Sequence, residues 1–391
     1  MSNARDMDRL LSSFVDRGLP GCGLKITRRG ETVYEGYFGQ ANLETGAPVT
    51  KRSVFRQAST SKLPLYTVAL MLYEQGRFLM TDPLYAYLPE YRESTKVVRL
   101  PNGQIEIVKT DRPLIVRDVM TMRCGLPYCN APADDAEDLT LRYMSRAMGP
   151  LWQKGHYTNW EQVRAMATVP LAFEPGSHWL YGFGSELTCA LVEAITGKGV
   201  DDVLEEMLFK PLEMHDTRSH FFGDIKERLV ILYGRDGAGK LNPLTLPFER
   251  TFLPGEENEM GWARLFATVE DYSNLMTMLA NGGVFKGRRL MGRKTIDLMR
   301  SNVLDQIQMA DYTNPYEAGY GYGYGVRTLV SRAAGDVNGS LGAFGWTGGF
   351  GSWCEADPED GTAFVYMHNM LPDDERYCHP RVRTVAYGMI E

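Results

Sequence analysis

Residues 59 to 62 read Ser-Thr-Ser-Lys, which places a hydroxyl three positions before an amine. The apolar residues that follow recur at helical spacing, so a helix is predicted to begin at this tetrad. On a helix, positions i and i+3 share a face, and the Lys62 amine can approach the Ser59 hydroxyl from one turn on. A desolvated lysine can act as a base, and a helix N-terminus favours a developing anion. The pair therefore predicts nucleophilic catalysis by Ser59.

Such a tetrad also arises by chance roughly once in a chain of this length, so it needs support from other motifs. The chain has no G-x-S-x-G for an α/β-hydrolase nucleophile and no H-E-x-x-H for zinc. Alternating glycines from Gly319 to Gly325 lack the rest of a dinucleotide fingerprint, and Cys378-His379 is an isolated pair. We expect no cofactor and no metal.

Composition sets limits on partners and compartment. The 391 residues are 44% hydrophobic and 23% charged, with a formal net charge of -7 and no basic block. This pattern argues against nucleic-acid and membrane partners, and no apolar stretch is long enough to span a bilayer. Six cysteines lie apart without a C-x-x-C pair, and the residues after Met1 do not read as a signal peptide. We expect a cytoplasmic protein that acts on a small molecule, with its oligomeric state left open.

The elements that must position Ser59 come from both ends of the chain. Helical spacing from Met7 to Phe14 predicts an opening helix, and alternating residues predict a hairpin from residues 21–26 and 32–37. Near the other end, a final helix is predicted to start near Pro380, because proline suits a first helical turn. Three more strands are predicted before it, at residues 324–330, 340–355 and 362–368.

This order of elements predicts an α+β fold, an α/β sandwich in which one antiparallel sheet is built from both chain ends and flanked by the terminal helices. Residues 1–80 and 260–391 would form this domain, and residues 81–259 a mostly helical inserted domain. The insertion also contains a predicted surface hairpin at residues 97–108. We place the active site between the two domains.

Several segments resemble one family when taken in order. Residues 54–77, which contain Ser59 and Lys62, resemble the nucleophile segment of serine β-lactamases, penicillin-binding proteins and family VIII carboxylesterases. Met122 and Cys124 depart from the family pattern, since His and Ser are usual there. The resemblance implies a serine β-lactamase-like fold and an acyl-enzyme mechanism. Agreement in order and spacing continues over nearly the whole chain, at residues 82–91, 115–127, 174–181 and 196–217.

The family's second motif, Tyr-x-Asn, reads Tyr181-Gly182-Phe183 in this chain. The tyrosine is kept and the amide is missing. By resemblance, the Tyr181 phenol would relay the proton between Ser59 and the leaving group, and a neighbouring ammonium would favour its phenolate. Taken alone, one tyrosine among 21 would be read as a packing residue.

The third motif, Lys-Thr-Gly or His-x-Gly in the family, reads Trp346-Thr347-Gly348 and is followed by Gly349. By resemblance, the backbone N–H groups of Gly349 and Ser59 would form the oxyanion hole. A glycine-rich strand with a packed indole would give the same pattern without any catalytic role.

Two departures favour one activity within the family. Trp346 replaces the cation that helps to hold a substrate carboxylate, and Phe183 replaces the asparagine expected near a substrate amide. We expect Trp346, Gly348 and Phe183 to contact substrate in an apolar site, which favours small, mostly uncharged esters, by hydrolysis or acyl transfer.

Two alternatives stay open. One is an amide hydrolase of the β-lactamase, D-aminopeptidase or D-amino-acid amidase kind. The other is a catalytically inactive ligand-binding homologue. Retention of Ser59, Lys62 and Tyr181 together argues against the inactive homologue.

Overall fold

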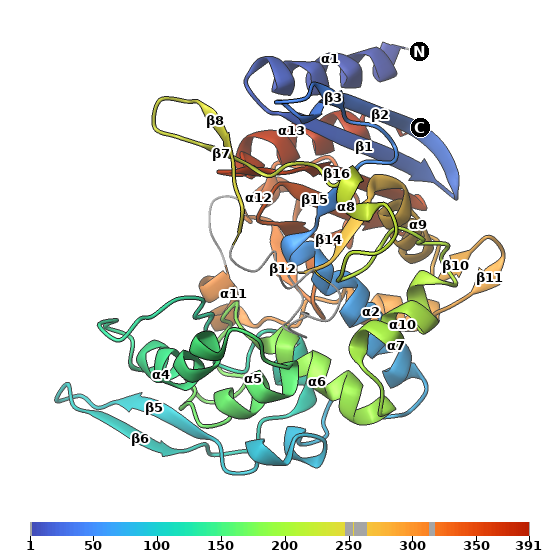
Figure 1. Ribbon diagram of the computed structural model, residues 1–391. Coiled ribbons are helices and arrows are strands. Elements are labelled where there is room, and N and C mark those ends of the chain that lie inside the picture. Colours follow the sequence, from blue (N-terminus) through green and yellow to red (C-terminus); the bar gives the residue numbers. More distant parts are fainter. Residues whose placement is uncertain (1, 247–252, 254–263, 313–316, 391) are drawn as a thin grey trace.

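A single antiparallel sheet joins the two ends of the chain in the computed structural model, which describes residues 2–246, 253, 264–312 and 317–390. The sheet has eight strands in the order β12-β13-β14-β15-β16-β1-β2-β3. Because β1 pairs with β16, N-terminal and C-terminal strands lie side by side at its centre (Figure 1). The strands are β1 (Gly21–Arg28), β2 (Glu31–Asn42), β3 (Ala47–Pro48), β12 (Tyr320–Tyr322), β13 (Arg327–Leu329), β14 (Phe344–Gly348), β15 (Ser352–Asp357) and β16 (Thr362–His368).

Helices cover both faces of this sheet. The two terminal helices, α1 and α13, pack together on one face, and α9 packs against β1 and β16 on the other (Figure 1). This architecture confirms the predicted fold class. The helices are α1 (Ser2–Asp16), α2 (Lys62–Glu74), α3 (Val116–Met120), α4 (Leu139–Lys154), α5 (Asn159–Met166), α6 (Gly184–Thr196), α7 (Val200–Leu204), α8 (Ile225–Arg228), α9 (Val269–Ala280), α10 (Arg293–Met299), α11 (Gln306–Tyr312), α12 (Arg332–Gly335) and α13 (Glu375–Tyr387).

Alternate residues of β1 face the two helical layers. Leu24 and Ile26 are fully buried among the side chains of α1 and α13. Lys25, between them, points to the other face and pairs with Glu270 of α9. This period of two follows from the pleat of a strand, and it explains how one sheet can carry a layer of helices on each side.

Smaller strands and a helical region surround the sheet. The predicted surface hairpin is present as β5 and β6, and α3 to α6 contribute to a second buried cluster that includes Met144, Val163 and Leu187. The division of the chain into two domains stays a prediction. The short strands are β4 (Val54–Arg56), β5 (Thr95–Arg99), β6 (Ile105–Lys109), β7 (Tyr233–Arg235), β8 (Leu241–Pro243), β9 (Phe266–Thr268), β10 (Val284–Phe285), β11 (Arg288–Arg289) and β17 (Met370–Leu371).

Three predicted boundaries differ from the structure. The last helix begins at Glu375, and Pro380 lies inside it, because the preceding turn is held in the core by buried Cys378 and His379. Residues 340–355 contain two strands, β14 and most of β15, which a tight turn joins. Of residues 324–330, only β13 is a strand, since Gly325 has a left-handed backbone (φ 75°).

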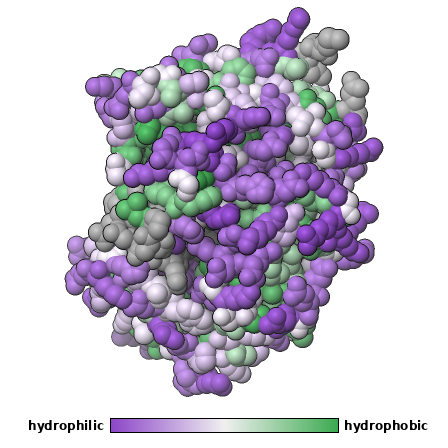
Figure 2. Space-filling model, turned by 45° about the vertical axis from the view of Figure 1, so that its right-hand side comes forward, coloured by the Kyte–Doolittle hydropathy of each residue, from purple (hydrophilic) through white to green (hydrophobic). Residues whose placement is uncertain are grey.

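The outer surface is polar on the face that Figure 2 shows. Hydrophilic side chains predominate there, and hydrophobic ones gather in small areas between them. Within the described residues, we find no helix that combines the length and the apolar character needed to cross a bilayer.

Candidate active site

Ser59 lies in a single 3₁₀ turn, Ala58–Ser61, that leads directly into α2. Ala58, the residue before it, has a left-handed backbone with φ 46°. This conformation costs a residue with a Cβ about 1 kcal/mol, so the surrounding contacts must hold the turn in place.

Hydrogen bonds hold this turn from several sides. The Gln57 N–H donates to the Leu265 carbonyl (2.9 Å), and the Tyr272 hydroxyl donates to the Thr60 carbonyl (2.6 Å). The Thr60 hydroxyl also lies 3.0 Å from the Ser352 hydroxyl on β15. Because these partners are far apart in the sequence, the position of Ser59 is set by tertiary contacts.

Lys62 is the first residue of α2, and its Nζ lies 3.1 Å from the Ser59 Oγ. The lysine is only 2% exposed, because α2 is buried on nearly all sides. A helix that is apolar all round belongs in a core, and here it carries one amine to the nucleophile. A proton can pass between the two groups at this distance.

Two tyrosine rings flank the Lys62 amine. The Nζ lies 5.1 Å from the ring centroid of Tyr181 and 5.6 Å from that of Tyr128. The faces of these rings attract an ammonium group without accepting its proton. Tyr181 therefore lies beside the predicted nucleophile and base, as the resemblance implied.

Trp346 contacts Tyr181 directly. Its indole Nε1–H donates a hydrogen bond to the Tyr181 hydroxyl at 3.1 Å, and the two ring centroids are 5.4 Å apart. An indole has one N–H donor, so this hydrogen bond to Tyr181 engages the donor of Trp346. Trp346 also lines the cavity that borders Ser59, which is described below. It therefore both shapes that cavity and orients Tyr181.

Gly348 and Gly349 have different surroundings. A Cβ on Gly348 would lie 2.2 Å from the Gln57 carbonyl oxygen, so glycine allows β14 to approach the turn that carries Ser59. A Cβ on Gly349 would meet no atom within 4 Å. The open space at Gly349 fits the predicted approach of a substrate carbonyl.

One cavity of about 520 Å³ connects these groups, a volume typical of small-molecule sites. We call it the site cavity. Ser59, Tyr181 and Gly349 all line it. Its wall also carries four carboxyl groups and one guanidinium. The full lining is Ser59, Trp179, Tyr181, Asp311, Tyr312, Glu317, Trp346, Thr347, Gly349, Asp373, Glu375 and Arg376.

Phe183 and Gly348, which we expected to contact substrate, are not among the residues that line the site cavity. Phe183 is 3% exposed and packs edge-on against Tyr128, with ring centroids 4.9 Å apart. It precedes α6, and its ring enters the buried cluster of the helical region. Its apolar character therefore serves packing, and the inference about substrate from Phe183 does not hold in this structure.

The sequence reasoning missed Tyr128 and Glu186. Tyr128 directly follows the family segment that ends at Pro127, and a bridge between Pro127 and Gly182 brings it beside Tyr181. Glu186 lies in the first turn of α6 and is 7% exposed. Burial raises the pKa of Glu186 above its ordinary value, and the Lys62 ammonium acts in the opposite direction. An acidic residue five positions after Tyr181 was the available signal.

No group of three or more His, Cys, Asp or Glu side chains in the described part of the chain is arranged to hold a metal ion. Burial raises the pKa of the Tyr128 phenol well above its ordinary range. The groups beside Ser59 that can take part in chemistry are its hydroxyl, the Lys62 amine and the phenols of Tyr128 and Tyr181.

Solved structures with the same fold include EstCE1, a hydrolase with promiscuous acyltransferase activity. The two structures align with a TM-score of 0.81 at 22% sequence identity, and the alignment covers 99% of each chain. Among curated proteins, the esterase EstB of Burkholderia gladioli is 25% identical over 86% of this chain and 83% of its own length. A putative D-alanyl-D-alanine carboxypeptidase of Escherichia coli is 24% identical over 93% of this chain and 81% of its own.

A family model described as Beta-lactamase matches residues 7–387, which is nearly the whole chain. The matched region contains the sheet, the turn that carries Ser59 and every residue of the predicted site. From the first helix to the last, the chain belongs to the beta-lactamase family.

Proposed function

We propose that this protein is a serine hydrolase that acts on small esters through an acyl-enzyme at Ser59. The distance of 3.1 Å between the Lys62 Nζ and the Ser59 Oγ, at the wall of the site cavity, carries the proposal. The Ser59 oxygen attacks the ester carbonyl carbon, and Lys62 with Tyr181 passes the hydroxyl proton to the departing alcohol. Water then attacks the acyl-enzyme, releasing the acid and restoring Ser59.

The oxyanion of each tetrahedral intermediate would be held by the backbone N–H groups of Ser59 and Gly349. Both residues line the site cavity, and Gly349 directly follows β14, which contacts the turn that carries Ser59. A donor of this kind typically contributes a factor of about 100 to 1,000 to kcat.

The charged residues of the site cavity favour uncharged esters as substrates over penicillins and cephalosporins, which carry a carboxylate. Trp346 contributes an apolar ring where β-lactamases have a cation, and four carboxyl groups outnumber the one guanidinium of Arg376. A substrate carboxylate would lose its hydration and meet mostly like charge, which is unfavourable. An uncharged ester loses no comparable hydration.

The same carboxyl groups favour a second candidate, hydrolysis of amides or esters of amino acids. An ammonium group on such a substrate would be attracted by Asp311 and Glu317 at the cavity wall. The similarity to a putative D-alanyl-D-alanine carboxypeptidase supports only the amide-bond part of this candidate.

Free thiols support a place in the cytoplasm. Five buried cysteines, Cys22, Cys124, Cys129, Cys354 and Cys378, form no disulfide. Reducing compartments keep thiols in this state. We propose accordingly that the enzyme works there on small molecules, without nucleic-acid or membrane partners.

Initial rates on four substrates test these proposals: p-nitrophenyl butyrate, nitrocefin, D-alanine p-nitroanilide and succinyl mono-p-nitrophenyl ester. We expect the highest kcat/KM with p-nitrophenyl butyrate, and little turnover of nitrocefin or of the succinyl ester. A preference for D-alanine p-nitroanilide would favour the second candidate. Preference for nitrocefin would refute the ester proposal. Adding a primary alcohol and measuring the transferred acyl product would show whether acyl transfer competes with hydrolysis.

A further inference from the structure

Two buried histidines lie behind the turn that joins β14 to β15. The His379 Nε2 is 3.0 Å from the carbonyl oxygen of Gly351, the last residue of this turn. The ring of His368 fills the space beside Gly351 so closely that a Cβ there would lie 1.9 Å from its Nε2. Both histidines are fully buried.

The second histidine fixes another part of the cavity wall. The His368 Nε2 lies 2.6 Å from the backbone carbonyl oxygen of Asp373, a residue that lines the site cavity. Its Nδ1 lies 3.0 Å from the Tyr366 hydroxyl. A carbonyl can only accept a hydrogen bond, so the Nε2 of each histidine carries the hydrogen.

Both imidazoles are neutral near pH 7. Burial lowers the pKa of His368 to about 4 and lowers that of His379 well below its ordinary value. Neither ring lines the site cavity, so neither is placed to exchange a proton with substrate. His368 reaches the backbone of Asp373, which lines the cavity, and His379 reaches Gly351, two residues after the lining residue Gly349.

The turn is held by one hydrogen bond of its own and by another from Met370, outside it. The Gly351 N–H donates to the Gly348 carbonyl (2.8 Å), and the Phe350 carbonyl accepts from the Met370 N–H (3.0 Å). Gly351 has φ 110°, a conformation that side chains with a Cβ rarely adopt. Glycine leaves this segment conformationally free, so donors outside the turn, the Met370 N–H on Phe350 and the His379 ring on Gly351, hold its geometry.

We infer that His379 is a positioning residue for the oxyanion hole. By donating its Nε2–H to the Gly351 carbonyl, it holds the turn so that the Gly349 N–H faces the substrate oxygen. This inference rests on the proposed role of Gly349. Loss of the hydrogen bond from His379 should therefore lower kcat, because the oxyanion exists only in the transition state and the intermediates.

The test compares two amides at position 379. His379→Gln can place an amide N–H near the position of the imidazole Nε2–H, whereas His379→Asn is too short to reach Gly351. With p-nitrophenyl butyrate, we expect His379→Asn to lower kcat about tenfold or more, with KM changed less than about threefold. His379→Gln should stay within about threefold of wild-type kcat. Inhibition by butaneboronic acid, which forms a tetrahedral adduct with serine, should weaken by the same factor as kcat.

Val382→Ala is the matched control, since Val382 is fully buried on the same helix and contacts the same core. It should lower Tm without lowering kcat or boronate affinity. If His379→Asn does not fold, His379→Met is measured in its place, because methionine fills the same space without an N–H. Wild-type kcat in the folded variant, or an equal loss in Val382→Ala, would overturn the inference. Retention of activity in Ser59→Ala would instead overturn the proposed function.

Discussion

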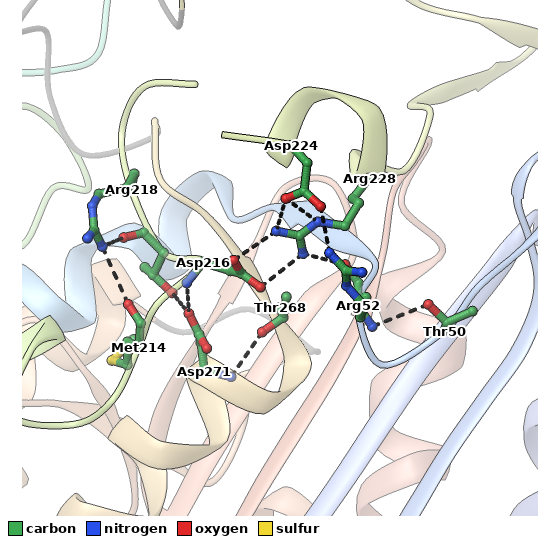
Figure 3. A network of polar contacts seen from close by, with 10 residues as sticks. Thr50, Arg52, Met214, Asp216, Arg218, Asp224, Arg228, Thr268 and Asp271 are labelled. Atoms are coloured by element: carbon green, nitrogen blue, oxygen red, sulfur yellow. Dashed lines mark hydrogen bonds and ion pairs between the residues drawn. The ribbon is translucent and has the colours of Figure 1, made fainter. Parts of the chain in front are cut away.

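Two groups of polar side chains in this protein differ in how completely their charges are paired. The polar network of Figure 3 joins α8 to the start of α9. In it, Arg228 makes two hydrogen bonds to Asp216 (2.8 and 2.9 Å) and one to Asp224 (2.9 Å). The Asp271 carboxyl accepts from the Asp216 N–H (2.7 Å) and from the Thr217 hydroxyl (2.9 Å). The Arg228 guanidinium thus has two carboxyl partners, and the Asp271 carboxyl is held by two neutral donors.

The group around Ser59 is arranged in the opposite way. The amine of Lys62 lies at hydrogen-bond distance from an uncharged hydroxyl and faces the rings of Tyr128 and Tyr181. Glu186, the nearby carboxyl, is itself buried and has a raised pKa. A hydrogen-bonded network of this kind stabilises the fold, whereas a loosely paired amine can exchange its proton with a substrate. The difference separates variants that lower activity from variants that lower stability.

The largest effect is expected for Ser59→Ala, which removes the nucleophile. Activity toward p-nitrophenyl butyrate should fall at least about a thousandfold, with Tm nearly unchanged. Intact mass spectrometry after treatment with a phosphonate ester should show one adduct on the wild type, on the peptide that contains Ser59, and none on the variant. Labelling of another serine would show that Ser59 is not the nucleophile.

Lys62→Ala and Tyr181→Phe should each lower kcat at least about a hundredfold, because each removes a positioned proton-transfer group. The double variant should be little slower than the slower single variant, since groups that act as a unit lose most of the rate at the first deletion. Circular dichroism and Tm serve as controls for folding. Near wild-type activity in Tyr181→Phe would reduce Tyr181 to a packing residue.

Arg228→Met tests whether the polar network of Figure 3 contributes to stability and not to activity. The Arg228 side chain is 13% exposed, and its loss leaves Asp216 without this guanidinium, while Asp224 keeps its ion pair with Arg52. We expect the free energy of unfolding in urea to fall by about 2 to 3 kcal/mol, while kcat of the folded enzyme stays within about twofold of wild type. A large loss of kcat at unchanged stability would contradict the separation of the two groups.

The Asp271 carboxyl makes the free energy of unfolding depend on pH. Burial raises the pKa of its carboxyl from 3.8 to about 6. The folded state therefore holds the proton more tightly than the unfolded state, and stability falls as the pH rises from about 4 to about 6. Asp271→Asn keeps an acceptor oxygen without the titration. Between pH 4.5 and pH 7, the unfolding free energy of the wild type should fall by about 2 kcal/mol relative to this variant. A constant difference across this range would exclude the shift.

Trp346→Lys should have the smallest effect, on substrate preference. A lysine would supply the cation that a cephalosporin carboxylate needs, so kcat/KM for nitrocefin relative to p-nitrophenyl butyrate should rise about tenfold, or about 1.4 kcal/mol. Both rates should fall, because the hydrogen bond from Trp346 to Tyr181 is lost. Trp346→Phe removes the same N–H without adding charge, and its ratio should not move toward nitrocefin. A ratio that moves toward the ester in Trp346→Lys would show that this position does not set the choice.

Much of the architecture could be predicted from local pattern. Alternation of apolar residues located the strands at both ends, because one strand face meets helices and the pattern repeats every second residue. The first helix, the hairpin of β1 and β2 and the strand β16 follow the predicted positions closely. The errors fell at Pro380, at residues 340–355 and at residues 324–330, where tertiary packing, a tight turn and a left-handed glycine decide where an element begins or ends.

For the site, the sequence by itself determined the spacing of Ser59 and Lys62, since two residues one turn apart on a helix must meet. Tyr181 and Gly349 followed from the order of family segments. Only the tertiary structure decided the rest. It joined the Trp346 indole to Tyr181, 165 residues away in the chain, turned Phe183 into the core, and placed His379 behind Gly351. Such contacts depend on which faces of distant elements meet, and no local pattern of residues encodes that choice.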